Sequence, residues 1–192
     1  MKLIPLSGRR PDATWGVCAT PVGEALLAFC EPAEKSGAFA SEGVCWLSFG
    51  ASQSAVEELR AFWKDGNLVR DDAKAEQLAR KIFADGAVAE LPEGGADMAL
   101  LVEGTPFQLK VWQALMGVAR GERITYTQLA QKAGIPSAVR SAATAIGRNN
   151  ISYLIPCHRI VPAGSGVGQY RWGPKVKKAL LDWELTLERG QS

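Results

Sequence analysis

The sequence changes character near residue 105, and this change limits the folds that the chain can adopt. Before this point, short apolar runs separated by turn residues indicate strands, and two amphipathic stretches indicate helices. After it, capping residues and tight turns mark a series of helices. We therefore expect an α+β protein with two domains, residues 1–97 and 98–192.

The first domain is predicted to be a small antiparallel sheet with helices. Ser54, followed three residues later by Glu57, is the predicted N-cap of the first helix. The full pattern predicts a hairpin at 14–31, a strand at 43–50, helices at 54–66 and 71–86, and a strand or extended connection at 97–104.

The second domain is predicted to be mostly helical. Thr105 and Pro106 are typical of an N-cap and a first helical position. The segments TYTQLAQKAGIP and SAVRSAATAIGRNN then form a helix, a turn at 134–136, and a second helix with Ser137 as the expected N-cap. This is a helix-turn-helix pattern, although many helical hairpins look alike. A last helix is expected to begin at Pro174.

Charge is distributed very unevenly along the chain. Residues 1–104 carry 10 Lys/Arg and 16 Asp/Glu, whereas residues 105–180 carry 11 Lys/Arg and a single acid, Glu122. A solvated basic face normally has acids interspersed, so this asymmetry favours a polyanion as the partner.

The second helix of the pair has an unusual composition for a DNA reader. AVRSAATAIG offers small residues and only one long polar side chain, Arg140. If the partner is DNA, such a helix suits contact with the backbone and minor groove better than reading of base edges. The alternative is an Ala-rich helix packed inside a bundle.

The remaining sequence features narrow the setting. No apolar run approaches the ~20 residues of a membrane helix, and the N-terminus does not resemble a secretion signal. We therefore expect a cytoplasmic protein with free thiols. The spacing of Cys18, Cys30 and Cys45 does not fit a zinc site, and these residues are expected in the core.

The segment LIPCHRIV places Cys157 directly before His158, the only histidine in the chain. The pair fits a thiol with its base, half of a metal site, or an accident of a buried segment. Neighbours on a regular strand point to opposite faces, so either the backbone turns at Pro156 or a water bridges the two side chains. Glu184 falls in the apolar arc of the last helix and needs a partner there, either His158 or Arg159.

These residues also carry a family resemblance. GTPFQLKVWQAL, ITYTQLAQKAG, AVRSAATAIGRNN, IPCHRIV and GVGQYRWGPKVKKALLDWE closely resemble the O6-alkylguanine-DNA alkyltransferases, and YRWG looks most like the C-terminal domain of the bacterial adaptive-response protein. The resemblance is dense over about residues 103–186. It implies a ribonuclease H-like first domain, a helix-turn-helix in the second, and irreversible transfer of an alkyl group from O6 of a flipped guanine in DNA, with O4 of thymine as a second possible source, to Cys157.

The resemblance also implies roles for individual residues. His158, oriented by Glu184, acts through a water on Cys157; Asn149 braces the cysteine segment; Tyr126 donates a hydrogen bond to the departing guanine. Arg140 fills the gap left by the flipped base, and the chain from Cys157 to Ile160 offers carbonyls to the guanine amine. The implied set that binds substrate or DNA is Arg140, Ser141, Ala142, Thr144, Arg148, Ile160 and Tyr170.

The sequence therefore predicts a DNA-repair alkyltransferase that needs no metal or cofactor, works as a monomer, and acts on double-stranded DNA containing O6-alkylguanine, with no membrane partner. Two alternatives belong to other classes: a non-catalytic helix-turn-helix protein that binds DNA or alkylated lesions, and a Cys-His hydrolase. Asn150 and Ala119 depart from the prolines that are usual in the family, and neither position is catalytic.

Overall fold

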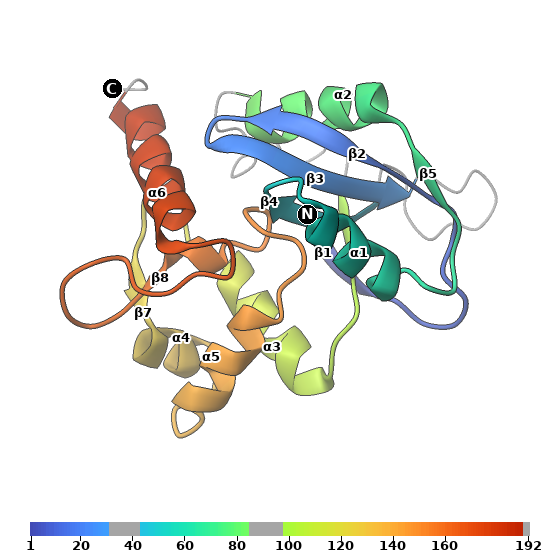
Figure 1. Ribbon diagram of the computed structural model, residues 1–192. Helices are drawn as coiled ribbons and strands as arrows, with labels where there is room; N and C mark the ends of the chain where they lie inside the picture. Colours follow the sequence, from blue (N-terminus) through green and yellow to red (C-terminus); the bar gives the residue numbers. More distant parts are fainter. Residues whose placement is uncertain (31–42, 85–97, 190–192) are drawn as a thin grey trace. The chain divides into compact units, whose positions relative to one another are not determined.

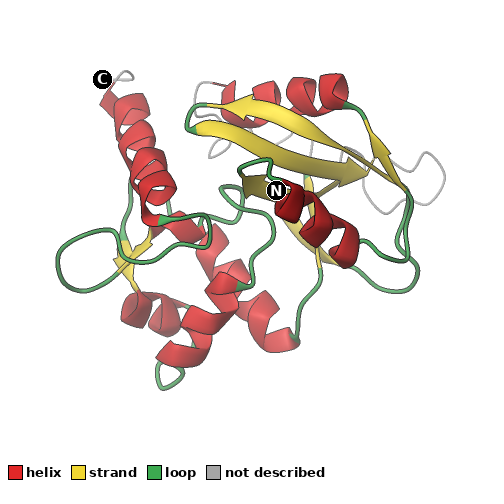
Figure 2. Ribbon diagram, viewed as in Figure 1, coloured by secondary structure: helices red, strands yellow, loops and turns green. Residues whose placement is uncertain are grey.

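A computed structural model describes residues 1–30, 43–84 and 98–189 (Figure 1). The chain divides into two compact units, Met1–Glu103 and Gly104–Ser192. The first is a sheet with helices and the second is mainly helical, which confirms the predicted α+β class (Figure 2).

The first unit contains a six-stranded sheet with the order β1-β6-β4-β3-β2-β5. Its strands are β1 (Lys2–Pro5), β2 (Ala13–Thr20), β3 (Gly23–Cys30), β4 (Gly43–Phe49), β5 (Leu68–Arg70) and β6 (Ala99–Val102). The predicted hairpin is β2–β3, and the strand predicted at 43–50 is β4. Because β6 belongs to this sheet, the first unit ends at Glu103, beyond the boundary predicted after residue 97.

The sheet is mixed, so the prediction of an antiparallel sheet is correct only for its middle. Strands β2, β3 and β4 pair antiparallel, whereas β5 joins β2, and β6 joins both β4 and β1, in parallel. The connections give part of the physical reason: β3 follows β2 through a tight turn and must be antiparallel to it, whereas β5 and β6 each come after a helix and can return parallel to their neighbours.

Helices α1 (Gln53–Phe62) and α2 (Asp72–Phe83) cover opposite faces of this sheet (Figure 1). Trp15 of β2 packs in one core cluster with Leu59 of α1, while the next residue, Gly16, lies against Ala75 of α2. Successive strand residues point to opposite faces, so the two helices must lie on different sides. Every residue of β4 is therefore buried.

The start of α1 differs from the prediction by two residues. The N-cap is Ser52, whose hydroxyl accepts a hydrogen bond from the Ala55 amide, and Ser54 lies inside the helix. Both serines were available, and Ser52 has the extended backbone that a cap requires. Helix α2 begins after Asp71, and its end predicted near Gly86 lies outside the described residues.

The second unit consists of helices around a short parallel pair of strands. Its elements are α3 (Pro106–Met116), β7 (Ile124–Thr125), α4 (Tyr126–Lys132), α5 (Val139–Gly147), a 3-10 turn (Cys157–Arg159), β8 (Ile160–Val161) and α6 (Pro174–Arg189). Helices α3, α4 and α5 pack on one another, and α6 packs on the 3-10 turn. Among the described residues, no helix is both long enough and apolar enough to cross a membrane.

Of the two N-caps predicted for α3 and α5, one is confirmed and one is wrong. Thr105 caps α3 in a reciprocal pair of hydrogen bonds with Gln108, and Pro106 is the first helical residue, as predicted. The prediction that Ser137 caps α5 is wrong. Ala138 holds the N-cap position and its carbonyl accepts from the Ala142 amide, which leaves Ser137 outside the helix.

The close approach of β2 and α2 yields a stability prediction. A Cβ added at Gly16 meets Ala75 Cβ, Asp71 O and Asp72 Cα, each at 2.8 Å, so Gly16→Ala must push strand and helix apart. We expect this change to lower the free energy of unfolding by about 1–3 kcal/mol in urea titrations. Gly164→Ala is the control, since nothing lies within 4 Å of the added carbon. Equal effects of the two changes would contradict the packing argument.

Candidate active site

Two γ-turns present Cys157. In the first, the Leu154 amide donates to the Ser152 carbonyl at 2.7 Å around Tyr153, which has a φ of 66°. In the second, the Cys157 amide donates to the Ile155 carbonyl at 2.7 Å around Pro156, with φ −79° and ψ 60°. The 3-10 turn follows immediately. The backbone therefore turns at Pro156, one of the two possibilities that the sequence left open.

Asn149 ties this segment together. Its Nδ2 donates to the Ile155 carbonyl at 3.0 Å and to Cys157 Sγ at 3.2 Å, and its Oδ1 accepts from the Ile151 amide at 2.9 Å. The side chain is buried, so each of these bonds is protected from water. Asn149 therefore contacts the segment at both turns and the thiol itself, and its role in bracing Cys157 for a reaction stays a prediction.

The thiol lies at the wall of a cavity of about 390 Å³. Tyr170 Oη lies 4.0 Å from Sγ and is hydrogen-bonded to the Ser152 hydroxyl. Burial raises the pKa of Cys157, while its hydrogen bonds with Asn149 and Tyr170 and the charge of Lys177 oppose the rise. The cavity is lined by Tyr126, Ala143, Ile146, Gly147, Cys157, Gln169, Tyr170, Arg171 and Trp172.

Both partners suggested for Glu184 are found. His158 Nε2 lies 2.9 Å from Glu184 Oε1, and the Arg159 guanidinium donates to both carboxylate oxygens at 2.6–3.3 Å. Arg159 also donates to the Val118 carbonyl at 2.6 Å. Glu184 and His158 are fully buried, so this group forms an ion pair and hydrogen bonds away from solvent.

These contacts fix the protonation of the histidine. Burial alone raises the pKa of Glu184, but hydrogen bonds from His158 and Arg159 and the positive charge of Arg159 outweigh it and bring the pKa to about 2. The carboxylate is then only an acceptor, so we assign the imidazole proton to Nε2. Burial lowers the pKa of His158, which keeps the ring neutral. Its Nδ1 is a buried acceptor with no hydrogen-bond partner among the described residues.

Lys177 is a functional candidate that the sequence reasoning missed. It is 1% exposed, and its Nζ donates to the carbonyls of Ile160 at 2.5 Å and Gln169 at 3.3 Å. Burial lowers its pKa to about 8, against an opposing effect of Cys157. The signal was available, because Lys177 precedes Leu180 and Glu184 by three and seven residues, the spacing of one helix face.

The residues predicted on the DNA side are mostly accessible. Arg140, Ser141, Thr144 and Arg148 are exposed on or just after α5. Ala142 is the exception: its side chain is fully buried, on the face of α5 that packs on α3 and α4, and its contact with DNA stays a prediction. The small residues of α5 thus fit both interpretations of its composition, because one face of the helix packs against other helices and the other face is exposed to a partner such as DNA.

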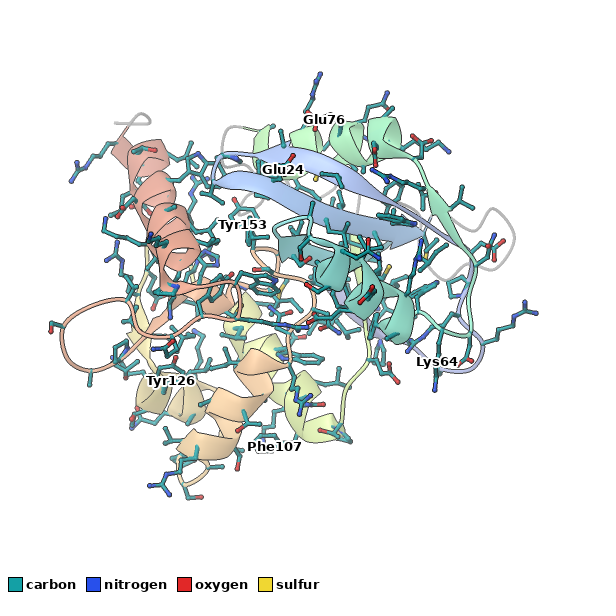
Figure 3. The ribbon with its side chains drawn as sticks, viewed as in Figure 1. Glu24, Lys64, Glu76, Phe107, Tyr126 and Tyr153 are labelled. Carbon is teal, nitrogen blue, oxygen red and sulfur yellow. The ribbon has the colours of Figure 1, made fainter. Side chains whose placement is uncertain are left out.

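Two further predicted residues lie at different depths. Tyr126, at the first turn of α4, is half-buried at the cavity, and burial together with Cys157 raises its pKa (Figure 3). Ile160 is fully buried, and its carbonyl accepts the hydrogen bond from Lys177. The structure therefore brings Tyr126, Cys157 and Tyr170 to one cavity. Asn149 contacts the thiol, and His158, the next residue along the chain, is paired with Glu184.

The other cysteines have no such surroundings. Cys18, Cys30 and Cys45 are buried free thiols in strands of the first unit, as predicted. Burial raises the pKa of Cys18 to about 12 and that of Cys45 well above its usual value. In the described ranges, no group of three or more His, Cys, Asp or Glu side chains is placed to hold a metal ion.

Comparisons with known proteins agree on one family. Residues 106–186 match the family described as 6-O-methylguanine DNA methyltransferase, DNA binding domain. A methylated-DNA–protein-cysteine methyltransferase from Methanosarcina acetivorans is 30% identical over 88% of this chain and 97% of its own length. The bifunctional transcriptional activator/DNA repair enzyme Ada of Escherichia coli is 33% identical over 94% of this chain and 52% of its own.

Solved structures agree with these sequence matches. The crystal structure of Mycobacterium tuberculosis O6-methylguanine methyltransferase has a TM-score of 0.61 at 28% identity, covering 91% of this chain and 93% of that one. The chain belongs to the O6-methylguanine-DNA methyltransferase family, which confirms the resemblance drawn from its motifs. It spans about half the length of the E. coli relative and of other bacterial and yeast relatives that it matches.

The buried ion pair gives a second prediction. Glu184→Gln leaves the Arg159 charge buried without its partner, so we expect a loss of about 3 kcal/mol in the free energy of unfolding. Because the pKa of Glu184 is lowered from 4.5 to about 2, wild-type stability should fall as pH drops through that range, and the variant should lack this part of the loss.

Asp182→Asn is the matched control on the same helix. Asp182 pairs with Lys178 at the surface, where both side chains are more than half exposed, so its loss should change stability by no more than about 0.5 kcal/mol. Urea unfolding at pH 7 and pH 3 measures both variants. A loss in Glu184→Gln no larger than that of the control would contradict the assigned role of the pair.

Proposed function

We propose that this protein repairs DNA by transferring an alkyl group, foremost methyl, from O6 of guanine to Cys157 in a single, irreversible turnover, with O4 of thymine as a possible second source. The observation that carries the proposal is the Cys157–His158–Glu184 arrangement at the wall of the cavity. Relatives named methylated-DNA–protein-cysteine methyltransferase support the same reaction.

The first step is activation of the thiol. Burial raises the pKa of Cys157, so the thiol is protonated at pH 7 and needs a base. His158 is neutral, its Nε2 proton is held by Glu184, and Nδ1 is left as the acceptor. We propose that the thiol proton passes to Nδ1 through a bridging water, because His158 Nδ1 and Cys157 Sγ form no direct hydrogen bond.

The second step is displacement of the base. The Cys157 thiolate forms a bond to the alkyl carbon while the bond from that carbon to O6 breaks, and the guanine leaves with the electron pair. Tyr126 at the cavity stabilises the departing base by donating a hydrogen bond or a proton. The raised pKa of Tyr126 keeps its hydroxyl protonated and able to donate. The resulting thioether has no route back, so each molecule acts once.

Double-stranded DNA is the proposed partner. Helices α4 and α5, joined by a turn in which Gly134 has a φ of 65°, form the proposed helix-turn-helix. Arg140, Ser141, Thr144 and Arg148 are exposed there, in the strongly basic stretch of the sequence. We propose that α5 approaches the minor groove and that Arg140 enters the stack in place of the flipped nucleotide. The DNA-bound crystal structure of the M. tuberculosis relative supports this partner.

The finer predictions on the rest of the chain stay proposals. We propose a ribonuclease H-like arrangement for the first unit, supported by antiparallel β2, β3 and β4 followed by β5 parallel to β2. We also propose that the protein acts in the cytoplasm as a monomer and reacts without a metal or cofactor, with the second unit, Gly104–Ser192, as the part that binds DNA and transfers the alkyl group.

Transfer of a labelled group tests the reaction. With duplex DNA carrying a labelled O6-methyl group, we expect label on the protein at no more than about one per molecule, because the thioether is stable. Cys157→Ala should abolish labelling, and Cys45→Ala, which removes another buried free thiol, should retain it. Release of methanol would identify a hydrolase instead, and binding without transfer would identify a lesion-binding module.

A second test concerns Arg140. Arg140→Ala should slow transfer from duplex DNA by about tenfold, since flipping costs a few kcal/mol and the variant loses the side chain that fills the gap. Transfer from the free base O6-methylguanine should change far less, because no base pair has to open. Single-turnover kinetics on the two substrates compare the effects, and equal losses would argue against the wedge.

A further inference from the structure

Tyr153 is a residue that the proposed mechanism does not use, although its position is unusual. It is the central residue of the first γ-turn, with a φ of 66°, and is 4% exposed. This left-handed conformation suits glycine or asparagine and is strained for a tyrosine. A glycine would allow the same backbone hydrogen bond from Leu154 to Ser152 without strain. The turn alone therefore gives no reason for an aromatic side chain.

The side chain contacts the histidine. The Tyr153 ring stacks on the His158 imidazole with centroids 5.8 Å apart and planes inclined by 18°, and its centroid lies 5.6 Å from that of Trp183 in α6. These distances are typical of favourable offset aromatic contacts. His158 thus has Glu184 at one edge and an aromatic plane against its face.

The two contacts restrain different motions. The hydrogen bond to Glu184 fixes the position of Nε2 but allows the ring plane to swing about that atom. A ring packed against the face blocks this swing, because it would open a gap or cause a clash in a close-packed interior. The direction of Nδ1 depends on the ring plane, so the second contact decides where the free lone pair points.

We infer that Tyr153 is a positioning residue: it holds the His158 ring in the plane that directs Nδ1 toward the thiol. The strained turn at residue 153 is what brings the aromatic ring onto the imidazole. The consequence for alkyl transfer rests on the proposed function, whereas the effect on the ring itself does not.

Nitrogen NMR tests the effect on the ring directly. His158 is the only histidine in the sequence, so the imidazole ¹⁵N signals report this ring alone. At pH 7 we expect one protonated Nε2 and one unprotonated Nδ1 signal in the wild type and in Tyr153→Phe, which keeps the ring. Tyr153→Leu, which removes the aromatic plane, should show averaged or doubled signals from more than one ring orientation.

Transfer kinetics test the consequence. At a saturating concentration of duplex DNA containing O6-methylguanine, Tyr153→Leu should slow the transfer step by about tenfold. This is part of the ~10²–10⁴-fold rate increase that a positioned base contributes. Tyr153→Phe keeps the ring and should transfer at the wild-type rate. Affinity for DNA should stay within about twofold in all variants, because Tyr153 is buried. Leu115→Ala, in the core of α3, controls for loss of stability alone and should keep both the ¹⁵N signals and the rate.

The outcomes separate cleanly. If Tyr153→Leu keeps the wild-type ¹⁵N signals and the wild-type transfer rate, the inference is overturned. It is also overturned if Tyr153→Phe loses as much transfer rate as Tyr153→Leu, because that result would assign the effect to the hydroxyl. If Tyr153→Leu does not fold, Tyr153→Asn removes the ring and suits the left-handed turn, and the same expectations apply. Failure of the wild type to transfer any alkyl group would remove the proposed function, and the NMR result would still decide the role of Tyr153.

Discussion

The site depends on the pairing of the buried Glu184 carboxylate with His158 and Arg159. It lies fully buried in α6 and is shared between the Arg159 guanidinium and His158 Nε2. Arg159 supplies the positive charge that keeps the carboxylate ionised, and an ionised carboxylate fixes the histidine tautomer. One carboxylate therefore serves both contacts: it neutralises the buried guanidinium, and it holds the Nε2 proton of the histidine that we propose as the base.

Two other buried polar side chains hold the segments around Cys157. Asn149 holds the segment from one side and donates to Sγ, and Lys177 holds the carbonyls of Ile160 and Gln169 on either side of the loop that leads to Tyr170. Asn149 and Lys177 are both buried, and buried polar groups that have hydrogen-bond partners favour a single arrangement. The second unit thus uses a network of buried polar side chains, rather than a larger apolar core, to place one sulfur atom.

The sequence predicted what depends on local pattern and failed where tertiary contacts decide. Strand periodicity and the Thr105–Pro106 cap placed most elements, and the apolar arc of α6 pointed to the buried Glu184. Neither the parallel pairing of the outer strands nor the choice of Ser52 over Ser54 as a cap is visible in a local window. The positive φ of Tyr153 gave no signal either, because tyrosine is normally a strand residue.

Burial of the thiol has a consequence beyond the reaction step. If the protein acts once, as we propose, a molecule whose sulfur reacts with an oxidant or another electrophile before it binds DNA can no longer carry out repair. Those side reactions require the thiolate, and the raised pKa of Cys157, only 3% exposed, keeps the resting population of thiolate small. The burial that makes the Cys157 thiol require a base therefore also protects it from these side reactions before DNA binds.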